Sequence, residues 1–241
     1  MALIDHLLRR ADDALILGHR LSEWTGHAPM LEEDMALANM ALDLIGQARS
    51  LYAYSAQIEG GTEDSFAYLR REGAYRNLLL VEQPNGDFAR TILRQFLYAA
   101  FADPFWRATM TSNDATLAAI AAKAEKEMAY HLRHSAEWVV RLGDSTPEAR
   151  RRIEAAIAYL WPYTGEMFEA DPVDLGLAAD PATLAAGWRE TVNEVFARAT
   201  LSLPRDGWMQ AGGRHGRHSE HLGHLLAELQ YMQRAFPGAK W

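Results

Sequence analysis

Apolar residues recur every three or four positions along most of this 241-residue chain, whereas the strict alternation of half-buried strands is nearly absent. This spacing predicts an all-α fold. The predicted helices cover residues 3–26, 29–60, 63–80, 87–111 and 114–143, then one helix from 147, one from 181 and a last one over 217–235. We expect five or six of them to exceed twenty residues, which is about 30 Å of helix each.

Local signals set these boundaries. Gly60 and Gly61 together stop the second helix, and the turn-forming run Gln-Pro-Asn-Gly-Asp at 83–87 separates two others. Asp114 has the position of an N-cap, Pro147 opens the first turn of a helix, and Asp180 precedes Pro181 at the start of another. Asp103 before Pro104 predicts a kink.

The second helix carries an apolar face. Five of its residues recur at helical spacing and are expected to be buried against neighbouring helices: Leu37, Met40, Leu44, Ala48 and Leu51. Long helices joined by mostly short loops indicate a bundle, apart from an Asp/Gly/Pro-rich connection over 170–180. Because we find no internal repeat and no linker, we expect one domain over residues 1–241.

Composition narrows the function classes. The chain has 24 Lys and Arg against 32 Asp and Glu, a formal charge of −8, which opposes binding to nucleic acid. It has no cysteine, so thiolate metal sites, disulfides and cysteine nucleophiles are excluded, and a cytoplasmic location is expected. Asp5 interrupts the only stretch where a signal peptide would lie, and no apolar run is long enough to span a membrane. At 49% apolar residues, intrinsic disorder is also excluded.

A long bundle rich in Glu and His suggests a di-iron carboxylate site, which is typically built from two Glu-x-x-His motifs and two further carboxylates. The nine histidines stand at positions 6, 19, 27, 131, 134, 215, 218, 221 and 224. None of them follows an acidic residue by three positions. The usual ligand pattern for two iron ions is therefore missing, and we expect no metal ligands of that kind in this chain.

Acid–histidine pairs at a spacing of four do occur, at Glu23 and His27, at Glu127 and His131, and at Glu220 and His224. Side chains at this spacing share a helix face. We interpret these pairs as surface or helix-end ion pairs, each contributing a few tenths of a kcal/mol, about 0.2–0.5. A relic or mononuclear metal site is the alternative.

Polar residues also interrupt the apolar second helix at steps of four, at Asn39, Asp43 and Gln47. We favour a stripe that meets solvent or a partner. In the alternative, the stripe lines the inside of the bundle where metal ligands would otherwise lie, and its buried amides must then be hydrogen-bonded.

Glycine and basic residues gather at 212–218, directly before the last predicted helix. Backbone amides at a helix start, together with cationic side chains, suit a phosphate group. A mobile loop that needs glycines for its turns is the alternative interpretation. The four histidines from His215 to His224 recur every three residues and rotate around the helix, so they cannot converge on one ion.

Four strings in order carry a family resemblance: LSEWTGHAP at 21–29, ALANMALDLIGQAR at 36–49, NLLLVEQPNGDFA at 77–89 and EHLGHLLAELQYMQ at 220–233. Over nearly its whole length, including the terminal Trp241, the chain resembles the family of the non-catalytic, ferritin-like subunit of bacterial phenylacetyl-CoA epoxidases. The resemblance implies a ferritin-like bundle of long antiparallel helices with extra C-terminal helices.

The resemblance also implies a role. In that family a multicomponent monooxygenase epoxidises the aromatic ring of phenylacetyl-CoA in aerobic phenylacetate degradation. A sister subunit of similar fold holds the di-iron centre, and the subunit that this chain resembles pairs with it and stabilises it without catalysis. A flavin and iron–sulfur reductase and small accessory subunits are the other expected partners, and a homodimer is expected of the isolated chain. Because coenzyme A carries phosphates, Arg214 and Arg217 become candidate contacts for a substrate seated mainly on the sister.

Two other interpretations stay open. One is an independent metal-dependent oxidase with a non-standard ligand set, of which Glu127, His131, Asp43 and Glu23 are the candidates. The other is a self-contained helical binding or storage module, which would form a homo-oligomer indifferent to any sister subunit.

Overall fold

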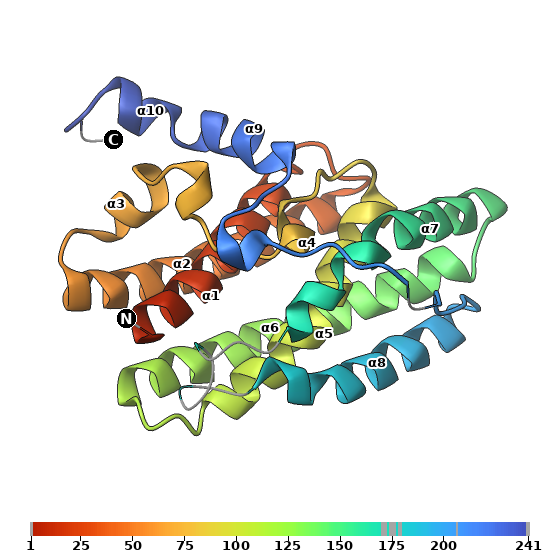
Figure 1. The fold of residues 1–241 in the computed structure, drawn as a ribbon. Coiled ribbons are helices and arrows are strands. Elements are labelled where there is room, and N and C mark those ends of the chain that lie inside the picture. The colour runs from red at the N-terminus through yellow and green to blue at the C-terminus, as the bar shows by residue number, and fades with distance from the viewer. Residues whose placement is uncertain (1, 170–172, 174–176, 178–179, 206, 240–241) are drawn as a thin grey trace.

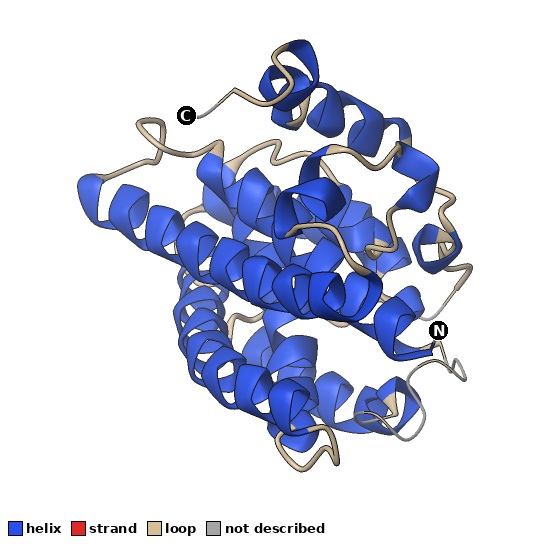
Figure 2. Cartoon of the chain, turned by 90° about the vertical axis from the view of Figure 1, so that its left-hand side faces the viewer, coloured by secondary structure: helices blue, strands red, loops and turns tan. Residues whose placement is uncertain are grey.

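A computed structural model describes residues 2–169, 173, 177, 180–205 and 207–239. All regular elements in these ranges are helices, as Figures 1 and 2 show. The α-helices are α1 (Ala2–Ser22), α2 (Leu31–Glu59), α3 (Glu63–Tyr68), α4 (Leu79–Glu82), α5 (Phe88–Thr109), α6 (Ala115–Gly143), α7 (Pro147–Leu160), α8 (Pro181–Arg198), α9 (Glu220–Leu229) and α10 (Tyr231–Ala235). The 3-10 helices are η1 (Glu72–Ala74), η2 (Trp161–Tyr163), η3 (Gly165–Phe168) and η4 (Gly213–His215). The all-α prediction is confirmed.

Two helix pairs form the central bundle. Helix α1 packs along α2, α5 packs along α6, and α2 contacts α6. Helices α7 and α8 lie against α5 and α6, while α9 and α10 lie over α3 and η1 near the C-terminus (Figure 1). Among the described residues, the four bundle helices are the ones longer than twenty residues, at 21, 29, 22 and 29 residues. The expected number of five or six is therefore wrong.

The core lies between these helices and is almost entirely aliphatic and aromatic. The five residues predicted to form the apolar face of α2 are all buried, with exposed fractions between 0 and 1%. Phe96, Phe101 and Trp106 of α5 face the same core. Helix α5 is buried on nearly all sides because α4, α6, α7 and α8 all contact it.

Most predicted helix starts are confirmed by their caps. Asp87, Asp114 and Thr146 each accept a hydrogen bond from the backbone N–H three residues later. Asp180, which directly precedes Pro181, accepts one from the backbone N–H of Ala182. These side chains satisfy backbone donors that have no partner in the first helical turn. Helix α5 runs through Pro104 to Thr109. Most of the 170–180 connection, and Trp241, lie outside the described residues.

Some predicted boundaries are wrong. Helix α1 ends at Ser22 and gives way to tight turns before Gly26, which has φ +80°. The last predicted helix begins at Glu220 and divides at Gln230 into α9 and α10. The largest error concerns residues 63–80, where a single helix was expected. The chain instead forms α3 and η1 and then extends to α4.

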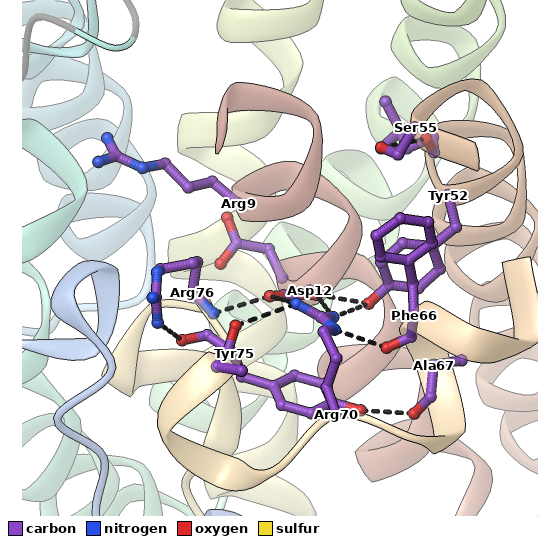
Figure 3. A network of polar contacts seen from close by, with 12 residues as sticks. Arg9, Asp12, Tyr52, Ser55, Phe66, Ala67, Arg70, Tyr75 and Arg76 are labelled. Atoms are coloured by element: carbon purple, nitrogen blue, oxygen red, sulfur yellow. Dashed lines mark hydrogen bonds and ion pairs between the residues drawn. The ribbon is translucent and has the colours of Figure 1, made fainter. Parts of the chain in front are cut away.

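A buried carboxylate explains why the helix over 63–80 breaks. Asp12 of α1 is fully buried, and its Oδ2 accepts the backbone N–H of Arg76 at 2.7 Å (Figure 3). Its Oδ1 accepts the Tyr52 hydroxyl of α2 at 2.5 Å, and the Arg70 guanidinium pairs with both oxygens. Tertiary hydrogen bonds thus replace the helical ones of this segment.

Three further buried carboxylates act in the same way. Together with Asp12 we call them the connector carboxylates: Asp13 accepts the N–H of Leu78 at 2.7 Å, Glu166 accepts those of Leu79 and Gly212 at 2.8 and 2.9 Å, and Glu82 accepts that of Ser219 at 2.7 Å. Each has an exposed fraction of 2% or less. They fix the irregular segments 69–79 and 212–219 against the bundle.

Candidate functional site

Helices α2 and α6 bring together two pairs of polar side chains inside the bundle. His131 Nε2 lies 3.1 Å from Asp43 Oδ2, and Gln47 Nε2 donates to Glu127 Oε2 at 2.8 Å. Each helix contributes residues four apart, so both pairs lie on facing sides of the two helices. We call these four residues the α2–α6 cluster.

A fifth side chain, from α5, contacts the other ring nitrogen of the His131 imidazole. Gln95 of α5 is fully buried, and its Nε2 lies 3.2 Å from His131 Nδ1. One neutral tautomer satisfies both contacts: with its proton on Nε2, the ring donates to Asp43 and accepts at Nδ1 from Gln95. The ring is therefore fixed in one orientation by α2 and α5.

Two buried oxygens of the site have no hydrogen-bond partner among the described residues: Oε1 of Gln47 and Oε1 of Gln95. On the outer side, Lys123 Nζ lies 3.4 Å from Glu127 Oε1. The cluster extends from the core to the surface. The exposed fraction of the side chain rises from 0% for His131 to 14% for Glu127 and 35% for Asp43. It is thus a buried hydrogen-bonded group with one edge at the surface.

His134, one turn along α6, has a different carboxylate partner. Its Nε2 lies 3.0 Å from Glu33 Oε2. Burial lowers the pKa of His134 despite the neighbouring Glu33 carboxylate. The ring of Tyr130 packs beside it, with centroids 6.0 Å apart.

The structure decides how the polar stripe of α2 lies. Asn39 is exposed, Asp43 is half-buried and Gln47 is buried, so the stripe runs from the surface into the bundle. The favoured prediction of a stripe that meets solvent or a partner is right for Asn39 and wrong for Gln47. As the alternative required, the Gln47 amide is hydrogen-bonded, although only through its nitrogen.

The candidate ligand set of the oxidase interpretation does not assemble as a whole. Asp43, Glu127 and His131 lie in the α2–α6 cluster, whereas Glu23 pairs with Arg20 at 2.8 Å and accepts from Asn85. Glu23 lies beyond the end of α1, so it shares no helix face with His27. Within the part of the chain that the structure describes, no three Asp, Glu or His side chains are grouped to hold a metal ion.

Arg214 and Arg217, the candidate phosphate contacts, lie in different surroundings. Arg214 is 7% exposed, and its guanidinium donates to both oxygens of Asp13 at 3.0 and 2.7 Å and to the carbonyls of Arg9 and Arg76. The Arg217 side chain is exposed. A phosphate therefore has direct access to Arg217, while Arg214 already has an anionic partner inside the chain.

Comparisons with known proteins show the family of this chain. The profile of a family described as phenylacetic acid catabolic protein matches residues 1–241. The chain is also 48% identical over 242 residues to the 1,2-phenylacetyl-CoA epoxidase subunit designated C of Escherichia coli strain K12, with 98% of each chain covered. The chain belongs to the phenylacetic acid catabolic protein family.

Membership in this family confirms the predicted ferritin-like bundle. Such a fold implies a carboxylate metal centre, and the α2–α6 cluster does not fit one. Two of the side chains around His131 and Glu127 are amides, and both present an N–H group, Gln47 to Glu127 and Gln95 to His131. No helix in the described part of this family member is long and apolar enough to cross a membrane.

Sequence reasoning missed the connector carboxylates. Asp12 and Asp13 lie on a helix whose apolar spacing is otherwise regular, and two adjacent acids within such a helix are a signal for buried pairing. Glu82 lies in the string at 77–89 that carried the family resemblance, but no local pattern shows that it accepts from Ser219, 137 residues later.

His218 is the counterpart of Glu82 in the segment before α9. Its Nδ1 lies 2.8 Å from Glu82 Oε2, and both side chains are fully buried. Burial alone would lower the pKa of His218, but the hydrogen bond and charge of Glu82 outweigh it and raise the pKa above 6.5.

This pair predicts a pH-dependent contribution to stability. Because the pKa of His218 is raised in the folded state, its contribution is fully present below the unfolded-state pKa and is lost as the pH rises through the folded-state value. His218→Gln should lower the free energy of unfolding by about 1.5–3 kcal/mol near pH 6 and by less near pH 9. Urea unfolding at both pH values measures this difference.

The matched control is His224→Gln, at an exposed position of α9. It should leave the free energy of unfolding within about 0.5 kcal/mol of the original chain at both pH values. An equal loss for His218→Gln at both pH values would contradict the protonated pair.

Proposed function

We propose that this chain is the structural, non-catalytic subunit of a multicomponent monooxygenase that epoxidises the ring of phenylacetyl-CoA in aerobic phenylacetate degradation. One observation carries the proposal: the chain is 48% identical, over 98% of both lengths, to a protein named as a subunit of 1,2-phenylacetyl-CoA epoxidase. In this role it pairs with a di-iron catalytic subunit and stabilises that partner's fold.

The chemistry of the α2–α6 cluster supports a role without catalysis. Oxygen activation at two irons needs several carboxylates and imidazoles directed at the same point. Here Asp43 and His131 contact each other, and Glu127 is held by Gln47 and Lys123. The di-iron centre and the reacting part of the thioester substrate therefore belong to the partner subunit in this proposal.

The rest of the assembly follows from the same relationship. A reductase supplies electrons to the partner's di-iron centre, and small accessory subunits complete the complex. The isolated chain forms a homodimer, acts as one domain over 1–241 and is cytoplasmic in this proposal. It has no nucleic-acid or membrane partner.

One face of α2 offers a surface for the catalytic subunit. Leu31, Met35 and Leu42 are 73, 58 and 66% exposed, and their spacings of four and seven place them on one side of the helix. Exposed apolar side chains gathered on one face are typical of interaction sites. Asp43 lies beside Leu42 and is half-exposed, so a subunit seated here would also cover the open edge of the α2–α6 cluster.

Coenzyme A contact is the remaining part of the proposal. Arg217 is exposed beside Gly212, Gly213 and Gly216, where a phosphate of the thioester could reach it. The same contact by Arg214 also stays a prediction. Its guanidinium is paired with Asp13, so a phosphate would have to compete with that carboxylate. Arg217→Ala alone is therefore the clean test, since Arg214→Ala would also remove the closest cationic partner of the buried Asp13 carboxylate.

The proposed function predicts how activity and iron divide between subunits. We expect the purified chain alone to oxidise no phenylacetyl-CoA, and the chain co-expressed with the sister subunit to support epoxidation once reductase and accessory subunits are added. Iron analysis should assign the metal to the sister. Ring oxidation by the chain alone, with iron bound to it, would instead establish the independent oxidase.

The interface predicts a specific effect of one leucine. Leu42→Asp should weaken binding of the sister at least about ten-fold, because it puts a charge in an apolar contact. Leu69→Asp, at a leucine that is 60% exposed beyond α3, is the matched control and should bind normally. Titration calorimetry checks both, and equal binding by the two variants would remove the α2 face from the proposal.

The phosphate contact predicts a change in substrate affinity. In the assembled complex, Arg217→Ala should raise KM for phenylacetyl-CoA several-fold with kcat unchanged, since an exposed ionic contact contributes about 0.2–1 kcal/mol. Arg198→Ala, an exposed arginine of α8, is the control and should not change KM. An unchanged KM for Arg217→Ala would refute the contact.

A further inference from the structure

The α2–α6 cluster combines side chains of metal-ligand types with an amide, although Asp43, Glu127 and His131 are not by themselves grouped to hold an ion. Asp43 and Gln47 face His131 and Glu127 across antiparallel helices, at N···O separations of 3.1 and 2.8 Å. Two ligand atoms that bind one ion at about 2.0–2.2 Å are themselves about 3 Å apart. Three of the four side chains are metal-ligand types, and the fourth, Gln47, is an amide.

We infer that the amide of Gln47, helped by Lys123, occupies the place of a cation in this cluster and thereby excludes a divalent metal ion. This inference concerns the chain by itself and does not depend on the proposed function. Its content is that one atom change, amide nitrogen to carboxylate oxygen, separates the cluster from a metal site.

The contacts of Glu127 support this assignment. A cation bound here would be expected to contact Glu127; instead the Gln47 N–H donates to Oε2, and Lys123 Nζ lies 3.4 Å from Oε1. A neutral amide N–H and one ammonium group of the chain thus supply contacts to Glu127 that an ion would make. Because Lys123 is 65% exposed at its side chain, it can turn away into solvent without leaving a buried charge.

The unpartnered oxygens point to the same arrangement. Oε1 of Gln47 is buried in the cluster without a hydrogen-bond donor among the described residues, so this oxygen is free to accept from a donor or to bind a cation. Gln95 Oε1 is also unpartnered within the described ranges. If its amide turns by 180°, its oxygen accepts a hydrogen bond from the Nδ1–H of His131 and leaves Nε2 of His131 free to bind a metal, which is the usual outer contact of a metal-bound imidazole.

Access to the cluster is open on one side. Asp43 is 35% exposed, while His131 is fully buried behind it. An ion can therefore enter past Asp43 and still reach the imidazole. This combination of a surface edge and a buried end is what a metal-binding variant requires.

The test is Gln47→Glu in the full chain, with Co²⁺ as the probe. We expect the original chain to show no visible absorption bands of bound Co²⁺ and the variant to bind about one ion per chain, through Asp43, Glu127, His131 and the new carboxylate. Added Co²⁺ should also raise the Tm of the variant, because an ion that binds only the folded state stabilises it. If the ion-free variant does not fold, it is refolded with and without Co²⁺. Folding only in the presence of Co²⁺ would then show that the variant binds the ion.

Further variants keep the result specific. Gln47→Glu with His131→Gln should lose Co²⁺ binding, and Gln47→Glu with Gln95→Met should bind roughly 10–100-fold more weakly. Gln57→Glu, at an exposed position of α2, is the matched control and should not bind. Co²⁺ binding by the original chain, or none by Gln47→Glu in either the folding or the refolding experiment, would overturn the inference.

Discussion

Buried carboxylates that accept backbone N–H groups are the interaction on which this fold depends. The helices of the bundle satisfy their own backbone, but the segments 69–79 and 212–219 do so only in part. Buried carboxylates accept the backbone N–H groups of Arg76, Leu78, Leu79, Gly212, Arg214 and Ser219 in these segments. An unpaired buried N–H group costs about as much as a lost hydrogen bond, about 1–3 kcal/mol. Asp12, Asp13, Glu82 and Glu166 supply the missing acceptors, and Arg70, Arg214 and His218 in turn offset three of these buried charges.

This constraint explains which parts of the fold follow from sequence. The long helices could be predicted because their caps and apolar spacing are local: Asp114 and Pro147 lie where expected. The break within 63–80 could not, because helical spacing continues there and the competing acceptors lie on α1, about 65 residues away. For the same reason the pairing of Arg214 with Asp13, 201 residues away along the chain, could not be predicted from local sequence.

The α2–α6 cluster shows a similar division. The spacing of four correctly placed Glu127 with His131, and Asp43 with Gln47, on common helix faces. It could not tell which faces meet, nor that Gln95 of α5 would support the imidazole. The sequence alone shows that no acid-x-x-His motif is present. The structure adds that the polar side chains of the α2–α6 cluster contact one another.

Hydrogen–deuterium exchange of single backbone amides tests the connector carboxylates most directly. The amides of Leu78, Leu79 and Ser219, which lie outside regular hydrogen-bonded helix turns, should exchange as slowly as the buried amides of α5. The amide of Gly26 also donates to a carboxylate, that of Asp34, but at the surface, and it should exchange far faster. Exchange of all four amides at the same fast rate would contradict the account.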